Sequence, residues 1–249
     1  MDLTRRTLLG QALGLGGAGV FGLVGGGSPT FTYRGAGDRI EVFRRGVKIQ
    51  QVESAKPSFL WVDQQRERLF VVNEIDEYEG LPTGTVESYA IAPRSGLIAL
   101  IARRALALSA VRPRHLAISP DGRFMVVAVY GGGAYNVLPV DGEGRIGRVS
   151  QAIKEIGRGV DWKLQAAAHP HSVVFHNSGK FVVGTDLGCD RINVFAFEDG
   201  RLRRIQRIAT PPGSGPGKVW LVGDGLEMLV EHRLGRSCGS YRLRGGGRT

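Results

Sequence analysis

One spacing recurs along this chain and limits the folds that it can adopt. At three places a proline is followed nine residues later by a glycine that closes a short polar turn: Pro113 with Gly122, Pro170 with Gly179 and Pro216 with Gly225. A degenerate copy begins at Pro57, with Arg66 in its ninth position, so that successive prolines are 56, 57 and 46 residues apart. We interpret this as an internal repeat, in which each copy is one structural unit.

Each repeat has the pattern of four antiparallel strands. Between residues 171 and 207, short runs rich in Val, Ile and Phe alternate with Gly, Asp and Asn turns, a pattern typical of strands joined by hairpins. Residues 115–153 show the same order of runs and turns. A four-stranded unit that repeats at a fixed period indicates a β-propeller. A helical solenoid would need a period of 3.6 residues, and a sandwich does not require self-similar units.

The repeat also predicts where a site lies. The residue after each proline begins a first strand, and the residue seventeen after the proline ends the second strand, so the two lie side by side in a hairpin at one mouth of the central channel. The first-strand starts are Ser58, Arg114, His171 and Gly217, and the second-strand ends are Glu74, Tyr130, Leu187 and Arg233. Polar groups that converge where blades meet are the expected place for chemistry.

The first 27 residues have the pattern of an export signal. Paired arginines at 5 and 6 precede twenty uncharged residues, 7–26, of which eight are glycine. This indicates the twin-arginine route and an exported, periplasmic or extracellular protein. A transmembrane anchor is the alternative, although so much glycine makes a poor membrane span. We therefore divide the chain into a signal or anchor segment, 1–27, and a propeller domain, 28–249.

The propeller is expected to be incomplete. Residues 39–53 resemble the third and fourth strands of a blade without the first two, and the repeat that begins at Pro216 reaches only a third-strand candidate, 239–244. We predict an all-β propeller of about four four-stranded antiparallel blades. Such an open ring leaves blade faces and strand edges unpaired, which predicts self-association or poor solubility.

Charge and cysteine content narrow the partners. The net charge of +10 is dispersed, and the two arginine-rich stretches, 201–207 and 233–248, are not interleaved with aromatic residues as a nucleic-acid groove would be. We therefore expect no nucleic-acid partner, whereas a positive channel suits an anionic small molecule. Cys189 and Cys238 lack metal-ligand spacing and are expected to be free thiols.

Several motifs together resemble one known family. They are Lys56-Pro57-Ser58-Phe59 with Val71-Val72-Asn73-Glu74, Pro113-Arg114-His115-Leu116 through Phe124, His169-Pro170-His171-Ser172-Val173-Val174 with Asp186-Leu187-Gly188-Cys189-Asp190-Arg191-Ile192, and the lead 210–216. Over residues 31–216 the chain resembles the 6-phosphogluconolactonase-like lactonase propellers, which are seven-bladed. The resemblance implies hydrolysis of a sugar-acid or carboxylic-acid lactone, without a metal or other cofactor.

The resemblance also implies a set of catalytic residues, of which one matches here. His171 corresponds to the family's catalytic histidine and is our candidate general base, a role that suits histidine near neutral pH. The family's arginine position falls on Gly217 and its glutamate position on Arg233, which predicts that the fourth repeat keeps its register but loses its chemistry.

Four further residues are candidates for substrate binding. Arg114 is the best remaining cation for an anionic ligand. Glu74 is either a channel acid or a solvated hairpin end, and His169 is either a lining or a structural loop residue. Arg191 is either a substrate clamp or the partner of Asp190 in a hairpin ion pair. Two functions therefore remain open: a working lactonase that binds an anionic lactone, and a catalytically inactive propeller that binds a ligand or has no function.

Overall fold

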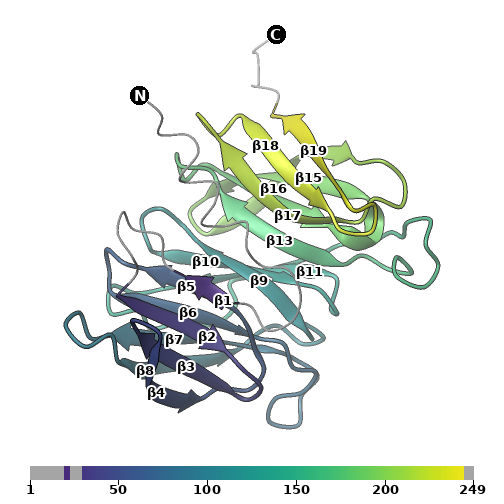
Figure 1. The fold of residues 1–249 in the computed structure, drawn as a ribbon. Coiled ribbons are helices and arrows are strands. Elements are labelled where there is room, and N and C mark those ends of the chain that lie inside the picture. The colour runs from purple at the N-terminus through teal and green to yellow at the C-terminus, as the bar shows by residue number, and fades with distance from the viewer. Residues whose placement is uncertain (1–19, 23–29, 244–249) are drawn as a thin grey trace.

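The chain forms antiparallel sheets that follow one another along the sequence. The computed structural model describes residues 20–22 and 30–243, and in these residues nineteen strands form five sheets (Figure 1). The first sheet contains β1 (Val20–Gly22), β2 (Phe31–Gly35), β3 (Arg39–Arg44) and β4 (Val47–Glu53). The second contains β5 (Pro57–Asp63), β6 (Arg68–Asn73), β7 (Thr85–Ile91) and β8 (Ile98–Ala105).

The remaining sheets repeat this order. The third contains β9 (Pro113–Ile118), β10 (Phe124–Val129), β11 (Ala134–Pro139) and β12 (Gln151–Lys154). The fourth contains β13 (Pro170–Phe175), β14 (Phe181–Asp186), β15 (Arg191–Glu198) and β16 (Arg201–Ala209), with a short 3-10 helix, η1 (Leu187–Cys189), before β15. The fifth contains β17 (Pro216–Val222), β18 (Glu227–His232) and β19 (Ser237–Arg242).

These sheets confirm the predicted all-β, incomplete propeller. Successive sheets contact one another through their first strands, β5 with β9, β9 with β13 and β13 with β17. The first and fifth sheets lie at opposite ends of the row, so that the five sheets do not close into a ring (Figure 1). The described part of the chain therefore holds four four-stranded sheets and one three-stranded sheet, slightly more than the four blades that the sequence predicted.

The prediction for residues 39–53 was wrong in one respect. They do form the third and fourth strands of a sheet, but β2 and β1 pair in front of them, with Gly35 opposite Ile40 and Phe21 opposite Tyr33. The sequence pattern missed β2 because this strand is only five residues long and precedes the first repeat proline, Pro57. Apart from Val20–Gly22, the predicted signal segment 1–27 lies outside the described residues.

Hydrophobic cores fill the spaces between neighbouring sheets, and strand alternation builds them. In β10, Met125 and Val127 pack toward the second sheet, whereas Val126 and Ala128 pack toward the fourth. Because successive side chains of a strand point to opposite faces, a strand buried on both faces needs a continuous apolar run. The run Phe124–Val129 is therefore a consequence of stacking between two sheets.

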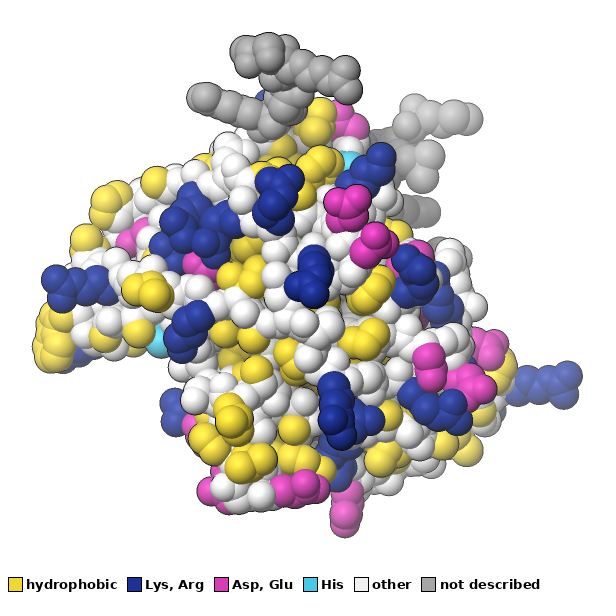
Figure 2. Space-filling view, turned by 180° about the vertical axis from the view of Figure 1, so that it is seen from behind, with side chains coloured by type: hydrophobic (Ala, Val, Ile, Leu, Met, Phe, Trp, Pro, Cys, Tyr) yellow, Lys and Arg dark blue, Asp and Glu magenta, His cyan; other side chains and the backbone are white. Residues whose placement is uncertain are grey.

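The charged side chains on the surface do not gather into one patch on the face seen in Figure 2. On the face seen in Figure 2, Lys and Arg side chains are dispersed among acidic and hydrophobic ones. Cys189 and Cys238 are both free, as predicted. Among the described residues, no helix has the length and hydropathy that a membrane span requires.

Candidate active site at the propeller mouth

The repeat spacing places its predicted residues at one edge of the sheets. Each repeat proline pairs with the residue sixteen positions later: Pro57 with Asn73, Pro113 with Val129, Pro170 with Asp186 and Pro216 with His232. First-strand starts and second-strand ends therefore meet at the edge where β5, β9, β13 and β17 begin, which we call the mouth. Candidate side chains from the second to the fifth sheets lie there.

Arg114 and Glu74 form an ion pair across the second and third sheets. Arg114 Nη1 donates to both carboxylate oxygens of Glu74, at 2.5 and 2.6 Å. Both side chains are partly exposed. A bifurcated contact to a carboxylate fixes the direction of the guanidinium, so Glu74 acts on this cation as a positioning partner. The two candidates thus belong to one unit.

His171 is buried at the mouth and accepts a hydrogen bond from Arg233. Arg233 Nη1 lies 2.8 Å from His171 Nε2, and a guanidinium can only donate. Nε2 therefore carries the lone pair, and the proton of the neutral ring sits on Nδ1. Among the described residues Nδ1 is buried without a hydrogen-bond partner.

Several effects keep His171 neutral. Burial lowers its pKa well below 6.5, and the positive charges of Arg233 and Arg114 lower it further. A neutral imidazole near pH 7 is the form that can accept a proton. His171 is therefore neutral near pH 7, and the same lowered pKa makes its ring a weak proton acceptor.

Tyr130 is a mouth residue that was not among the predicted site residues. Its ring meets the ring of His171 edge-on at 6.1 Å and stacks on His169 at 4.4 Å. Burial raises the pKa of Tyr130, while the charges of Arg114 and Arg233 act in the opposite direction. The phenol stays protonated near pH 7 and can donate a hydrogen bond. Its position, seventeen residues after Pro113, was the signal that could have identified it.

His169 is held by backbone contacts. Its Nδ1 lies 3.0 Å from the carbonyl oxygen of Tyr130, and its backbone N–H donates to the buried Asp186 carboxylate at 2.8 Å. Because its ring is stacked on Tyr130, His169 packs against a mouth residue. This arrangement favours the structural alternative for His169.

Arg191 forms ion pairs with two buried carboxylates. Its Nη2 pairs with the buried carboxylates of Glu155 at 2.8 Å and Asp186 at 3.1 Å. The predicted hairpin pair with Asp190 does not form, because the Asp190 carboxylate instead accepts backbone N–H groups of Gly213 and Gly215. The Arg191 side chain is only 15% exposed, and the carboxylates of Glu155 and Asp186 compensate its positive charge.

In the fourth repeat, Arg233 brings a guanidinium to the mouth, whereas the expected loss of the family's chemistry there stays a prediction. A Cβ atom added at Gly217 would lie 2.5 Å from Cγ of Arg233, so the stem of Arg233 crosses this strand where glycine leaves room. Its guanidinium then reaches His171. A guanidinium is thus present beside the histidine, and it comes from the turn that follows β18. Matching positions by their spacing from the repeat proline could not reveal this contact, because spacing does not give the direction of a side chain.

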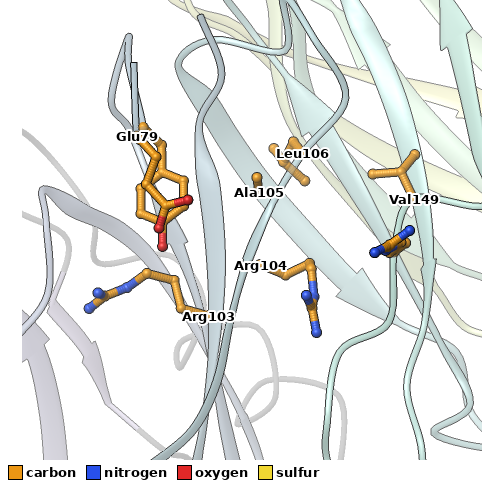
Figure 3. Close-up of a pocket in the computed structure, with 8 residues that line it drawn as sticks. Glu79, Arg103, Arg104, Ala105, Leu106 and Val149 are labelled. Atoms are coloured by element: carbon orange, nitrogen blue, oxygen red, sulfur yellow. The ribbon is translucent and has the colours of Figure 1, made fainter. Parts of the chain in front are cut away.

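One described pocket lies away from the mouth. It has a volume of about 500 Å³ and is lined by the end of β8, the loop before β7 and the segment before β12. Figure 3 shows Arg103 and Arg104 pointing to opposite sides of their strand, with Arg103 on the side where Glu79 lies. Arg103 is also paired with the buried Glu87 at 2.6 Å. None of the predicted site residues lines this pocket.

No metal cluster competes with this interpretation of the mouth. Within residues 20–22 and 30–243, no group of three or more His, Cys, Asp or Glu side chains is placed to hold a metal ion. The described mouth residues provide a neutral imidazole, a phenol, an ion-paired arginine and a second arginine.

Comparison with known proteins identifies relatives across most of the chain. The family model described as "Lactonase, 7-bladed beta-propeller" matches residues 30–221. A 6-phosphogluconolactonase of Formosa agariphila is 27% identical over 230 residues, covering 87% of this chain and 64% of that protein. The 6-phosphogluconolactonase of Bacillus subtilis is 24% identical over 163 residues, covering 66% of this chain and 44% of that protein.

Solved structures agree in fold. The periplasmic gluconolactonase PpgL of Pseudomonas aeruginosa superposes with a TM-score of 0.72 at 28% identity, covering 90% of this chain and 63% of that one. A putative 6-phosphogluconolactonase of Bacteroides fragilis gives a TM-score of 0.74 at 23% identity, covering 92% of this chain and 64% of that one. This chain spans between about half and two thirds of the length of the relatives it matches.

Proposed function

Because this chain belongs to the seven-bladed lactonase β-propeller family, we propose that it hydrolyses a sugar-acid or carboxylic-acid lactone at the mouth. The observation that carries the proposal is the convergence of a neutral histidine, His171, with the two cations Arg114 and Arg233. Relatives named 6-phosphogluconolactonase and gluconolactonase support the lactone as substrate class.

The proposed reaction needs a base and cations. His171 Nε2 takes a proton from water while the water oxygen forms a bond to the lactone carbonyl carbon. We assign the stabilisation of the negative charge that develops on the carbonyl oxygen to Arg114 or to the Tyr130 hydroxyl. The bond from the carbonyl carbon to the ring oxygen then breaks, and the ring oxygen takes the proton held on His171. The product is an open-chain hydroxy acid.

The experiment is a hydrolysis assay on a panel of δ- and γ-lactones, phosphorylated and unphosphorylated. Loss of general-base catalysis costs about 10²–10⁴-fold, so His171→Ala should lower kcat/KM by that factor. His176→Ala is the matched control, because the half-buried His176 follows the end of β13 that is remote from the mouth, where it contacts Ser178 and the backbone carbonyl of Asp224. The control should keep wild-type rates. Equal rates in all three proteins would contradict the proposal.

One observation favours the second candidate function, a propeller that binds a ligand without catalysis. The lone pair that a general base needs is already occupied by Arg233. If this contact persists with ligand bound, His171 cannot accept a proton from water. Background hydrolysis in wild type and variant alike, together with binding of an anionic ligand, would support this alternative.

We also propose that the protein is exported. The paired arginines at 5 and 6 and the uncharged segment 7–26 support export by the twin-arginine route. The likeness to a protein named a periplasmic gluconolactonase is compatible with it. Export should be abolished when both arginines are replaced by lysine, as fractionation of expressing cells would show.

A further inference from the structure

We propose that Arg233 is the anion-binding residue of the mouth, and that an anionic group on the lactone draws Arg233 away from His171 and so frees the Nε2 lone pair. This inference rests on the proposed lactonase function. It assigns a role to a residue that takes the place of a carboxylate in the resemblance, and it specifies the substrate as a lactone that carries a phosphate or carboxylate group.

The contact between Arg233 and His171 conflicts with the role of His171 as a base. A base needs its lone pair, and Arg233 Nη1 occupies that lone pair at 2.8 Å. At the same time, no carboxylate among the described residues forms an ion pair with Arg233. By contrast, Arg114 is matched by Glu74, and Arg191 by two buried acids. Arg233 is therefore a cation held by a neutral partner.

A neutral imidazole is a weaker partner for a guanidinium than an anion is. Hydrogen bonds from arginine to phosphate or carboxylate are charge-assisted, often two-pronged, and roughly twice as strong as bonds between neutral groups. An anionic ligand at the mouth would therefore compete successfully with His171 for Arg233. The buried imidazole cannot follow the guanidinium, because its strand, β13, is paired with β14 and packed between sheets.

Arg233 also has the freedom to move. It lies in the exposed turn between β18 and β19, and its stem rests over Gly217, which has no side chain to hold it. A rotation of the arginine side chain changes neither strand pairing nor a core contact. We call the replacement of His171 by an anion as the partner of Arg233 the exchange. It requires only that one exposed side chain adopts another rotamer.

The exchange can be observed without catalysis. The ring nitrogens of ¹⁵N-histidine-labelled protein report whether Nε2 accepts a hydrogen bond. Inorganic phosphate is the probe, and sodium chloride at the same ionic strength is the control. In the wild type, phosphate should move the His171 Nε2 resonance to the position that it has in Arg233→Met without phosphate. In Arg233→Met, phosphate should leave it unchanged. A resonance that ignores phosphate in the wild type, or that moves equally in both proteins, would overturn the proposal.

Kinetics supply the second readout. Arg233→Met should lower kcat/KM for 6-phosphorylated gluconolactone about tenfold or more, because a charge-assisted hydrogen bond is lost. It should raise kcat/KM for unphosphorylated gluconolactone, because the lone pair of His171 is released. Arg236→Met, an exposed arginine in the same turn, should change neither.

Opposite changes on the two substrates support the exchange. An equal fall on both would show that Arg233 only supports the structure, and would overturn it. If no protein opens any lactone, the proposed function fails, while the histidine resonances still decide whether an anion displaces Arg233.

Discussion

Two histidines, His171 at the mouth and His115 behind the strand that carries Arg114, are kept neutral by their surroundings. His171 is buried beside Arg233 and Arg114, and His115 is packed against Phe59 with ring centroids 3.8 Å apart. Burial, with the charge of Lys218, lowers the pKa of His115 to about 3. The burial of His115 behind its strand agrees with the alternation that turns Arg114 toward the mouth. Neutral histidines make the folded state sensitive to acid.

This sensitivity predicts the pH dependence of stability. The unfolded chain takes up a proton on His115 near pH 6.5, but the folded chain does so only near pH 3. Stability is therefore complete above pH 6.5 and falls as the pH drops from 6.5 toward 3, by up to about 1.4 kcal/mol per pH unit for each such group. His115→Gln should remove the His115 share, about 2 kcal/mol between pH 6.5 and 5, in urea unfolding. An unchanged slope would contradict the assignment.

At the residue scale, the sequence predicted positions better than contacts. Spacing from the repeat prolines placed Glu74, Arg114 and His171 at one edge, where they lie. It also marked Tyr130 and Arg233 as strand ends without showing what they touch. The contact of Arg233 with His171 depends on side-chain direction and on the missing side chain at Gly217, and neither follows from spacing.

At the element scale, a buried acid joins the third and fourth sheets. Glu155 follows β12 and is fully buried, and it forms ion pairs with Arg191 and Arg204 of the fourth sheet. Among the described residues, its loss leaves Arg204 without a carboxylate partner and leaves Arg191 with Asp186 alone, so that partly buried positive charge is less well compensated. The pairing across sheets was not predictable, because Glu155 lies in an irregular connection 36 and 49 residues before its partners.

Glu155→Gln should therefore destabilise the protein. Removing one member of a buried ion pair costs about 3–5 kcal/mol, so the midpoint of urea unfolding should fall markedly. Glu143→Gln is the matched control, because Glu143 pairs with Arg145 on the surface with both side chains more than half exposed. An exposed pair contributes about 0–1 kcal/mol, and the control should unfold almost as the wild type does. Equal midpoints for the two variants would show that Glu155 is not a structural link.

At the scale of the whole molecule, the repeat predicted the architecture. Four hairpins have the register that the proline spacing requires, and a hydrophobic core lies between each pair of neighbouring sheets. The first sheet was only half predicted, because β1 and β2 lie outside the repeat. Self-association through open sheet edges stays a prediction, which sedimentation velocity over a range of concentrations tests.

The central claim is that the mouth binds and opens an anionic lactone. A crystal structure with bound 6-phosphogluconate, the open-chain product of the phosphorylated lactone, tests it most directly. We expect the phosphate on Arg233, the carboxylate near Arg114, and a product oxygen about 2.6–3.2 Å from His171 Nε2, the reach that proton transfer needs. A ligand ordered in the pocket beside Arg103 and Arg104, with Arg233 still bonded to His171, would contradict it.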